Sequence, residues 1–191
     1  KLPGIITNMR KRIPDCGGEF LFEKKVTGFN IQDERISGVK TADGNNFQAD
    51  AFILATGHSA RDIFSLLYAN KILIEAKPFA LGVRVEHPQS LIDSSQYHCT
   101  VRGDFLPPAS YSWVQQVDGK GVFSFCMCPG GIIAPAATSP GELVVNGWSP
   151  SKRNNPFANS GIVVTVEEKD FQSYKQHGQL AAMFFQQAVE R

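Results

Sequence analysis

The sequence Ala51-Phe52-Ile53-Leu54-Ala55-Thr56-Gly57 sets the fold that we expect for this chain. Its first five residues form a continuous apolar run, typical of a strand that is buried on both faces in a parallel sheet. Thr56-Gly57 then ends the run abruptly. Ser59 is a suitable N-cap for a helix that continues through Leu67. The segment therefore predicts a strand, a tight turn and a helix.

The turn after this strand has the features of a ligand-binding turn. Gly57 permits a close approach of bare backbone to a ligand. The start of the following helix is expected to offer free N–H groups to a phosphate or another polar group. His58 is either a neutral imidazole that contacts a cofactor or a plain turn residue. Taken alone, the pattern also fits an ordinary strand-to-helix turn.

The residues before this segment predict a helix and a small meander of strands. Apolar residues at helical spacing indicate a helix that ends before Pro14: Leu2, Ile5, Ile6, Met9 and Ile13. Gly17-Gly18 breaks the chain, and Asp43-Gly44 is a turn between strands. We expect these strands at residues 19–22, 26–32, 36–41 and 47–49.

From about residue 72 the pattern changes to short strands joined by turns, which predicts a mostly antiparallel second unit. The expected strands are residues 79–86, 97–102, 111–117, 122–127, 143–146 and 162–165. Residues 129–141 are rich in glycine and proline, and a helix is expected over about 179–191. Aromatic residues near the end predict packing in a core or a domain interface, or an apolar surface for a homodimer: Phe171, Tyr174, Phe184 and Phe185.

The composition is that of a globular protein. The chain has 191 residues, 42% of them hydrophobic, and a net charge of +1 from 19 basic and 18 acidic side chains. That balance argues against nucleic-acid or membrane-surface binding, since both need a concentrated basic field. No signal peptide and no apolar run of about 20 residues is visible, so we expect a cytoplasmic protein.

Several further side chains are candidates for chemistry. Arg84 and Glu86 share a strand face, so they either form an ion pair, or Arg84 contacts an anion or a substrate. His87 before Pro88 is interpreted as a turn residue. His98 and His177 have no ligand spacing and are expected to be structural, so no metal site is predicted. No set of nucleophile, base and acid is recognisable, so the catalytic residues are not identified.

Part of the chain resembles the mid-portion of flavoproteins with two dinucleotide-binding folds. The resemblance rests on five segments: Gly17-Gly18-Glu19-Phe20, Val26-Thr27-Gly28-Phe29, Ile36-Ser37-Gly38-Val39, Asp43-Gly44 and the Ala55-Thr56-Gly57 strand end. In that superfamily a meander leaves the FAD-binding Rossmann unit and the Ala-Thr-Gly strand returns to it. The resemblance implies that the backbone of Val26 touches the adenine, and that Thr56 and Gly57 lie near the adenosine and phosphate half.

The rest of the chain is similar to a family of uncharacterised bacterial FAD-dependent dehydrogenases. The similarity rests on Phe79–Pro88, Ser124–Gly131, Asn146–Ser149, Arg153 and Phe157–Gly161, and with the first part it covers nearly the whole chain. It implies a flavin oxidoreductase whose substrate is not assigned. It also implies that Cys128-Pro129-Gly130-Gly131 lies close to the isoalloxazine ring, where backbone N–H groups steady the reduced flavin.

The two cysteines of this segment have three interpretations. Cys126 and Cys128 are separated by one residue, so their side chains fall on opposite faces of an extended strand and a direct disulfide is strained. They are structural thiols, thiols near the flavin without redox turnover, or a redox pair.

The sequence departs from the resemblance in lacking Gly-x-Gly-x-x-Gly. The nearest stretch, Gly119-Lys120-Gly121, lacks the third glycine and leads into a strand, so it is read as a hairpin turn. Because the chain also begins without Met, we expect an internal piece of a longer enzyme, inactive itself, that binds FAD weakly or not at all. The expected cofactor-binding residues are Val26, Ala55, Thr56, Gly57, His58, Cys128, Pro129, Gly130 and Gly131.

The expected architecture is mixed, α/β and α+β. Residues 1–71 are a partial Rossmann-like FAD-binding unit with a meander, residues 72–170 a mostly antiparallel substrate-side domain, and residues 171–191 a C-terminal helix. In the intact protein, FAD would exchange a hydride with NAD(P)H or with a small-molecule substrate. The alternatives are a flavin-linked modification enzyme and a non-catalytic binding domain.

Overall fold

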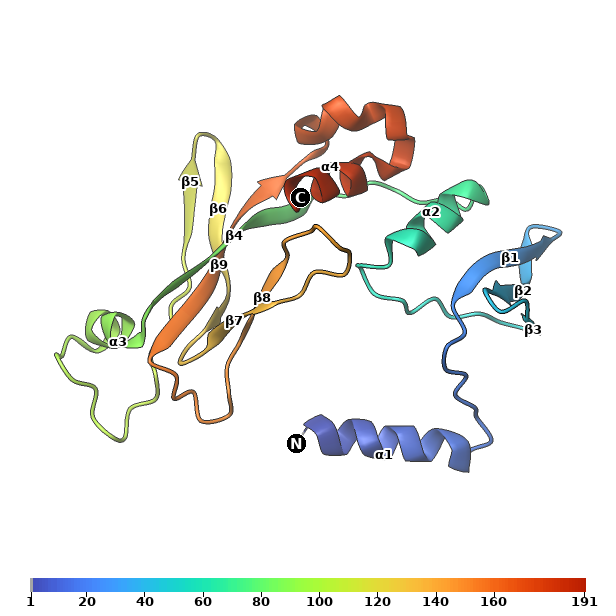
Figure 1. The fold of residues 1–191 in the computed structure, drawn as a ribbon. Coiled ribbons are helices and arrows are strands. Elements are labelled where there is room, and N and C mark those ends of the chain that lie inside the picture. Colours follow the sequence, from blue (N-terminus) through green and yellow to red (C-terminus); the bar gives the residue numbers. More distant parts are fainter. Residues whose placement is uncertain (1) are drawn as a thin grey trace. The chain divides into compact units, whose positions relative to one another are not determined.

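The computed structural model describes residues 2–191, which form two compact units, Lys1–Lys71 and Ile72–Arg191. Figure 1 shows the order of the elements along the chain. Helices and strands are mixed, and every strand pair among the described residues is antiparallel. The predicted mixed class with mostly antiparallel sheets is confirmed.

The first unit begins with helix α1, Leu2–Asp15. The helix continues two residues beyond the predicted end before Pro14, because a proline in the last turn gives up only its own N–H bond. The chain then leaves the helix at Gly17, whose φ is +83° and whose N–H donates to the carbonyl of Pro14. The apolar face of α1 is exposed, and none of its residues is buried.

The predicted meander is present as β1 (Val26–Gln32), β2 (Arg35–Thr41) and β3 (Asn46–Gln48), in the order β1-β2-β3. The pairing puts Phe29, Val39 and Phe47 directly opposite one another, so these apolar side chains share one face of the sheet. The strand predicted at residues 19–22 is absent. The rings of Phe20 and Phe22 stack in this irregular segment, with centroids 6.1 Å apart.

The strand predicted at residues 51–55 is also absent, and this segment is an open chain in which Ile53 is 94% exposed. A strand buried on both faces needs a neighbour on each side, and no strand among residues 2–191 pairs with this one. The Rossmann-like interpretation of this segment therefore stays a prediction. Helix α2 (Arg61–Ala69) follows, with Ala60 at its N-cap. Ser59 does not cap it, because its hydroxyl lies 3.1 Å from Nδ1 of His58.

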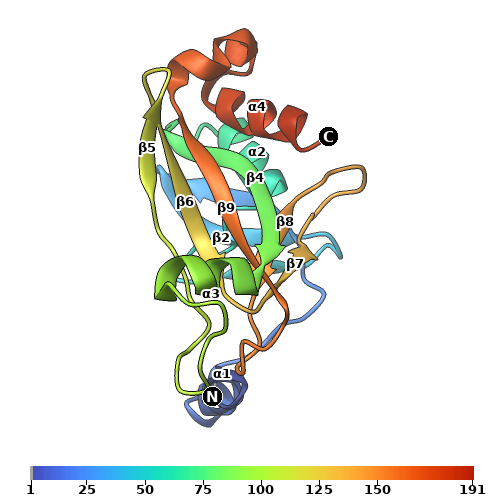
Figure 2. The ribbon, with the colours of Figure 1, turned by 90° about the vertical axis from the view of Figure 1, so that its left-hand side faces the viewer.

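The second unit is built on a four-stranded antiparallel sheet. Its strands are β4 (Phe79–Pro88), β5 (Val114–Val117), β6 (Lys120–Cys128) and β9 (Phe157–Val166), in the order β4-β9-β6-β5. Figure 2 shows these strands side by side. The hairpin turn predicted at Gly119-Lys120-Gly121 is present, at residues 118–119, and joins β5 to β6. A separate hairpin pairs β7 (Ile132–Pro135) with β8 (Val145–Trp148).

Two elements of this unit were not predicted. Helix α3 (Gln89–Tyr97) stands where a loop and the start of a strand at 97–102 were expected, and β7 lies inside the glycine- and proline-rich stretch. The buried side of α3 carries Gln89 and Asp93, one turn apart. Because these residues are polar, the helix lacks the apolar stripe from which an amphipathic helix is predicted. The strand predicted at 97–102 is an irregular loop instead.

The core of the second unit lies at one end of the long β4–β9 ribbon. Val166, Phe171 and Ala181 are buried there, with Phe79 and Phe185 packed against them. The 3₁₀ segment η1 (Glu168–Leu180) and helix α4 (Ala181–Val189) supply most of these side chains. The predicted core packing of the aromatic ending is confirmed, and α3 follows β4 at the opposite end of the ribbon (Figure 2).

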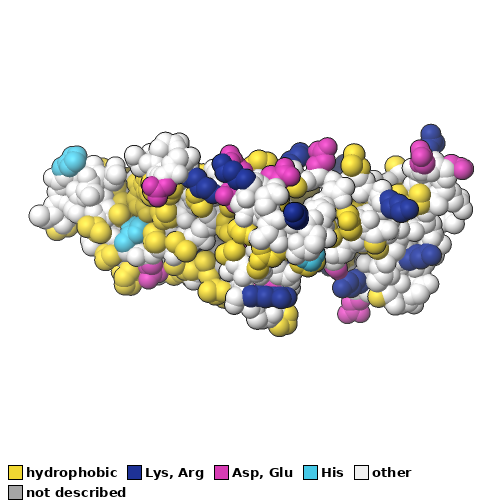
Figure 3. All heavy atoms as spheres, turned by 90° about the horizontal axis from the view of Figure 1, so that it is seen from above, with side chains coloured by type: hydrophobic (Ala, Val, Ile, Leu, Met, Phe, Trp, Pro, Cys, Tyr) yellow, Lys and Arg dark blue, Asp and Glu magenta, His cyan; other side chains and the backbone are white. Residues whose placement is uncertain are grey.

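Many large apolar side chains nevertheless remain exposed, as the yellow spheres of Figure 3 show for one face. In the second unit, Phe105 is fully exposed and Val101 is 80% exposed. The predicted homodimer contact through such surface stays a prediction. No helix within residues 2–191 is long and apolar enough to cross a membrane.

Candidate functional site

The predicted cofactor residues of the first unit lie at two places. Val26 begins β1, whereas Ala55, Thr56, Gly57 and His58 lie in the exposed loop before α2. Gly57 has φ +76°, and a Cβ at this position would meet no atom within 4 Å. Glycine is therefore required here by the backbone conformation, and open space surrounds it.

The start of α2 does not offer the free N–H groups that were expected there. The N–H of Arg61 donates to the carbonyl of Ser59 at 2.9 Å, and the N–H of Ile63 donates to the carbonyl of Ala60 at 3.0 Å. Asp62 also brings a carboxylate into this first turn, and its hydrogen bond with Lys25 lowers the pKa of Asp62. The expected free N–H groups are therefore not found at these positions, whereas a phosphate contact near this turn stays a prediction.

An ion pair connects the two places. Nζ of Lys25, the residue before Val26, lies 3.1 Å from a carboxylate oxygen of Asp62 in α2. Both side chains are more than half exposed, so the pair adds little to stability. It joins the start of the meander to the helix that follows the Gly57 turn.

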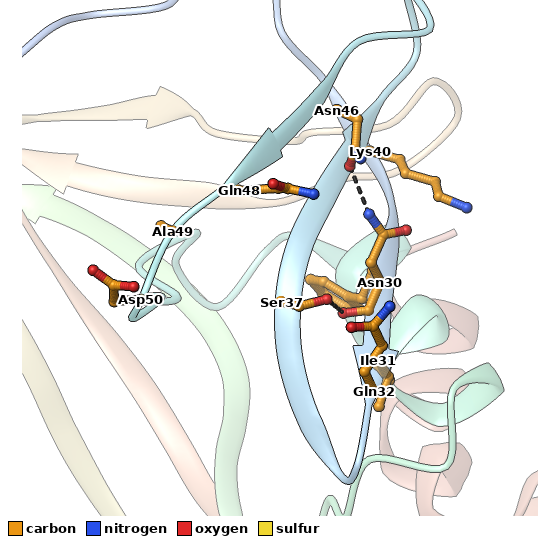
Figure 4. A pocket seen from close by; sticks show the side chains of 10 residues that line it. Asn30, Ile31, Gln32, Ser37, Lys40, Asn46, Gln48, Ala49 and Asp50 are labelled. Atoms are coloured by element: carbon orange, nitrogen blue, oxygen red, sulfur yellow. Dashed lines mark hydrogen bonds between the residues drawn. The ribbon is translucent and has the colours of Figure 1, made fainter.

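The meander carries an open hollow of about 980 Å³, shown in Figure 4. Asn30 donates to the side-chain oxygen of Asn46 at 2.7 Å, and Ser37, Lys40 and Gln48 also line it. The register places Asn30 opposite Gly38, in the row next to that of Phe29 and Val39, so it lies on the other face of the sheet. We interpret the hollow as the hydrated outer face of a small antiparallel sheet.

In the second unit, the predicted segment Cys128–Gly131 is a buried turn between β6 and β7. It follows a bulge, because the β6–β9 register shifts between Phe125 and Cys128, and Cys126 has φ +49°. Gly130 has φ +50°, and a Cβ there would overlap the carbonyl of Arg153. Glycine is thus required at position 130 by the protein's own packing.

Three hydrogen bonds from different elements hold this turn. The N–H of Gly130 donates to Oε1 of Gln89 at 2.7 Å. The hydroxyl of Ser149 donates to the carbonyl of Pro129 at 2.9 Å, and the N–H of Asn155 donates to the carbonyl of Gly130 at 3.3 Å. The turn is therefore fixed in place rather than mobile at the edge of the sheet.

Gln89 belongs to a buried polar network that sequence reasoning missed. Its Nε2 donates to Oδ1 of Asp93 at 2.8 Å and to the carbonyl of Ala109 at 3.0 Å. The N–H of Ala109 and Nε of Arg102 also donate to Asp93, at 2.8 and 2.9 Å. Burial opposes the charge of Asp93, but these donors outweigh it and lower the pKa of Asp93. The only sequence signal was a polar pair at helical spacing, Gln89 and Asp93.

Arg84 reaches from β4 toward the same turn. Its Nη1 donates to Oδ1 of Asn159 at 2.6 Å and to the carbonyl of Cys126 at 3.1 Å, and it lies 4.0 Å from Sγ of Cys128. Arg84 is opposite Gly161, and Asn159 is opposite Glu86, so the two side chains are diagonal neighbours. The expected ion pair between Arg84 and Glu86 is not among those of residues 2–191.

Asn159 is completely buried, and its Nδ2 has no hydrogen-bond partner. The short bond from Arg84 fixes which end of the amide is the oxygen, so the unpaired atom is a donor. A buried amide without a partner costs free energy, and such groups mark a place where a ligand or water completes the bonding. Asn159 lies in the segment Phe157–Gly161, which contributes to the family resemblance, but no local pattern predicts this role.

The cysteines of the turn form no disulfide. Cys126 is exposed and Cys128 is buried, and Sγ of Cys128 lies 3.4 Å from the carbonyl of Cys126. His87 was expected in a turn but lies in β4, where its ring is 5.5 Å from that of Tyr111. Burial lowers the pKa of His87, and its Nε2 is buried without a partner.

A small cavity lies against the sheet beside Arg84. Its volume is about 200 Å³, and strands β4, β6, β8 and β9 contribute to its wall. The lining residues are Leu81, Gly82, Val83, Arg84, Phe125, Leu143, Val144, Val145, Asn146, Gly161, Val163 and Glu190. The structure thus brings together Cys128–Gly131, Arg84 and Asn159 in the second unit, whereas Val26 and Ala55–His58 belong to the first.

The chain matches known proteins in two comparisons. It is similar to an uncharacterized protein of Clostridium beijerinckii, with 40% identity over 191 residues that cover 99% of this chain and 35% of the relative. The chain therefore spans about a third of that relative's length. Residues 78–191, which lie within the second unit, match the family described as FAD-dependent protein, C-terminal domain-like. The chain belongs to this FAD-dependent family.

Proposed function

We propose that the protein to which this chain belongs is an FAD-dependent oxidoreductase. FAD, when bound, supplies the hydride chemistry, and the protein supplies binding and orientation. The hydride would pass between the flavin and either NAD(P)H or a small organic substrate. The family match over residues 78–191 supports the flavin part of this proposal.

The observation that carries the proposal is the unpaired donor of Asn159. The flavin ring presents carbonyl and ring-nitrogen acceptors along one edge, which could satisfy the amide N–H of Asn159 beside the Arg84 guanidinium. Because protein atoms cover Nδ2 in this structure, the ring would reach it only after the covering atoms move. Arg84 adds a positive charge next to this donor, which favours the anionic reduced flavin. These residues therefore fit the isoalloxazine end of the cofactor.

The remaining assignments follow the family resemblance. Cys128, Pro129, Gly130 and Gly131 would lie beside the ring, on a turn that three hydrogen bonds hold rigid. Val26 and Ala55–His58 would contact the adenosine half, with Gly57 giving access to bare backbone. The helix start after this loop is not assigned a phosphate, because Asp62 occupies it.

The test is an absorbance spectrum of the full-length protein, before and after NADH or NADPH is added. We expect the visible absorption of bound oxidised flavin, and its loss on reduction by an effective donor. The informative variant is Asn159→Asp, which keeps an oxygen for Arg84 but removes the unpaired donor. We expect its FAD affinity to fall about tenfold, the effect of one lost hydrogen bond.

The matched control is Asn154→Leu, because Asn154 is exposed. It should keep the wild-type FAD affinity. A protein that binds no FAD when incubated with an excess would contradict the proposal. Equal affinity in the wild type and in Asn159→Asp would remove the observation on which the proposal rests.

A further inference from the structure

We propose that the cavity beside Arg84 binds a small carboxylate with an apolar body. The assignment of this ligand as the substrate of the flavin centre rests on the proposed function, whereas its binding does not. Four features of the second unit lead to this class of ligand: the unused edge of Arg84, the way the guanidinium is held, the charges around the cavity, and the lining of the cavity.

The first feature is the edge of Arg84 that has no acceptor. A guanidinium has five N–H donors, and two protein oxygens, on Asn159 and Cys126, already occupy Nη1. The donors on Nε and Nη2 have no acceptor among residues 2–191. These two nitrogens form one side of the guanidinium fork, which matches the two oxygens of a carboxylate.

The second feature is the fixed orientation of this fork. Asn159, which receives the 2.6 Å bond, is fully buried in the central strand β9. On the other side, β8 passes so close that a Cβ on Gly147 would overlap Nη1 of Arg84 and lie 2.6 Å from Oδ1 of Asn159. The guanidinium is therefore packed between two strands, and little rotamer freedom remains to be lost on binding.

The third feature is the set of charges around the cavity, which favours one anionic group. Arg84 lines the cavity and makes no ion pair with another described residue. The other charged residue of the lining is Glu190, which is 8% exposed and accepts a bond from Gln186 at 2.7 Å. A half-buried cation without a counter-ion attracts an anion.

The fourth feature is the lining of the cavity, whose side chains are apolar apart from those of Arg84, Asn146 and Glu190. Leu81, Val83, Phe125 and Val163 represent it, and all of them lie on strands of the sheet. A volume of about 200 Å³ equals the share of six or seven water molecules in the liquid. The ligand is therefore a monocarboxylate of a few carbon atoms, smaller than the drug-sized ligands of most pockets.

The test is calorimetric titration of the purified full-length protein with butyrate, butyramide and succinate, with FAD present. We expect butyrate to bind at least tenfold more tightly than its neutral isostere butyramide. Succinate should bind at least tenfold more weakly than butyrate, because its second charge would have to enter the apolar lining. Equal affinities for butyrate and butyramide would overturn the proposal.

Three variants distinguish a loss of the contact between Arg84 and the carboxylate from a loss of the fold. Arg84→Gln should weaken butyrate binding at least tenfold, and Arg84→Lys should weaken it less, since a lysine keeps the charge but not the fork. Val163→Phe should abolish binding with Arg84 intact, because it fills the cavity. Arg35→Gln, at an exposed position of the first unit, is the control and should bind like the wild type. Circular dichroism confirms the fold of each variant, and butyrate binding unchanged in Val163→Phe would overturn the cavity assignment.

The outcomes for the ligand and for the cofactor are distinguishable. Retained flavin with no butyrate binding would overturn this inference and leave the proposed oxidoreductase intact. Butyrate binding that depends on Arg84, in a protein that never binds FAD, would support the carboxylate site and contradict the proposed function.

Discussion

At the scale of single residues, the same residue type occurs at two positions for different structural reasons. Gly130 has a positive φ and no room for a Cβ beside the carbonyl of Arg153, so packing within the chain explains the glycine. Gly57 also has a positive φ, but open space surrounds it. The same residue type thus closes a packed turn in one place and leaves a backbone accessible in the other.

His87 gives a prediction about pH at this scale. Burial lowers the pKa of His87, against the opposing charge of Glu86, and its Nε2 has no partner. The unfolded chain therefore takes up a proton more readily than the folded one as pH falls below about 6.5. Stability should be fully present above that pH and fall as pH drops through the lowered folded pKa. The measurement is thermal unfolding at pH 7.5 and 5.5.

The variant His87→Phe keeps a ring against Tyr111 but cannot take a proton. It should lose less stability than the wild type between the two pH values. His98→Asn is the control, because His98 is exposed and has a left-handed conformation that asparagine tolerates. Asp93 does not interfere, since its pKa is lowered from a value near 4. An identical pH dependence in His87→Phe and the wild type would rule out this role for His87.

At the scale of elements, helix α3 is the clearest case in which the structure differs from the sequence prediction. Its buried face is polar, and Gln89 and Asp93 hold the Cys128–Gly131 turn and the loop at Ala109. The strands, in contrast, were predictable wherever apolar and β-branched residues fill a pleated surface, as in β1, β4 and β6. The helix therefore acts as a clamp on the candidate site, built from hydrogen bonds rather than apolar packing.

We predict that Gln89→Leu destabilises the protein by about 2–3 kcal/mol, because it leaves the N–H of Gly130 and the carbonyl of Ala109 buried without partners. Urea unfolding measures this change. Gln96→Leu, an exposed position on the same helix, is the control and should change the free energy of unfolding by less than about 0.5 kcal/mol. A Gln89→Leu variant as stable as this control would show that the network is not needed.

At the scale of the whole molecule, the chain divides into a unit with few buried residues and a unit with a hydrophobic core. In Lys1–Lys71 the buried hydrophobic residues are Ile63 and Leu67, both in α2. In Ile72–Arg191, Phe171 is only 3% exposed and joins η1, α4 and the end of the sheet. Stability measured by unfolding should therefore depend mainly on the second unit.

Phe171→Ala tests this expectation. Removing a buried phenylalanine side chain leaves a cavity, and we expect a loss of about 3–5 kcal/mol in the free energy of unfolding. Phe105→Ala is the matched control, because the side chain of Phe105 is fully exposed and should contribute little. Chemical denaturation followed by circular dichroism compares the two. Equal losses in both variants would mean that the core does not lie where the structure has it.

The candidate site was predictable only in part. The Cys128–Gly131 segment was predicted as a site through the family resemblance, and the structure gives it the partners Gln89, Ser149 and Asn155. These partners come from segments 18 or more residues away in the sequence, so no local pattern connects them to the turn. Asn159 was missed for the same reason, since an unpaired buried donor is a property of the surroundings.

The sequence by itself determined the meander, the antiparallel second unit, the aromatic core and the resemblance to flavoproteins, because each depends on local periodicity, turn residues or contiguous motifs. Only the tertiary structure decided that residues 51–55 have no strand partner within 2–191, and that Arg84 donates to Asn159 instead of pairing with Glu86. Strand pairing and side-chain hydrogen bonds join residues that are distant in the chain. Their energies depend on which groups folding brings together, and local sequence does not encode that choice.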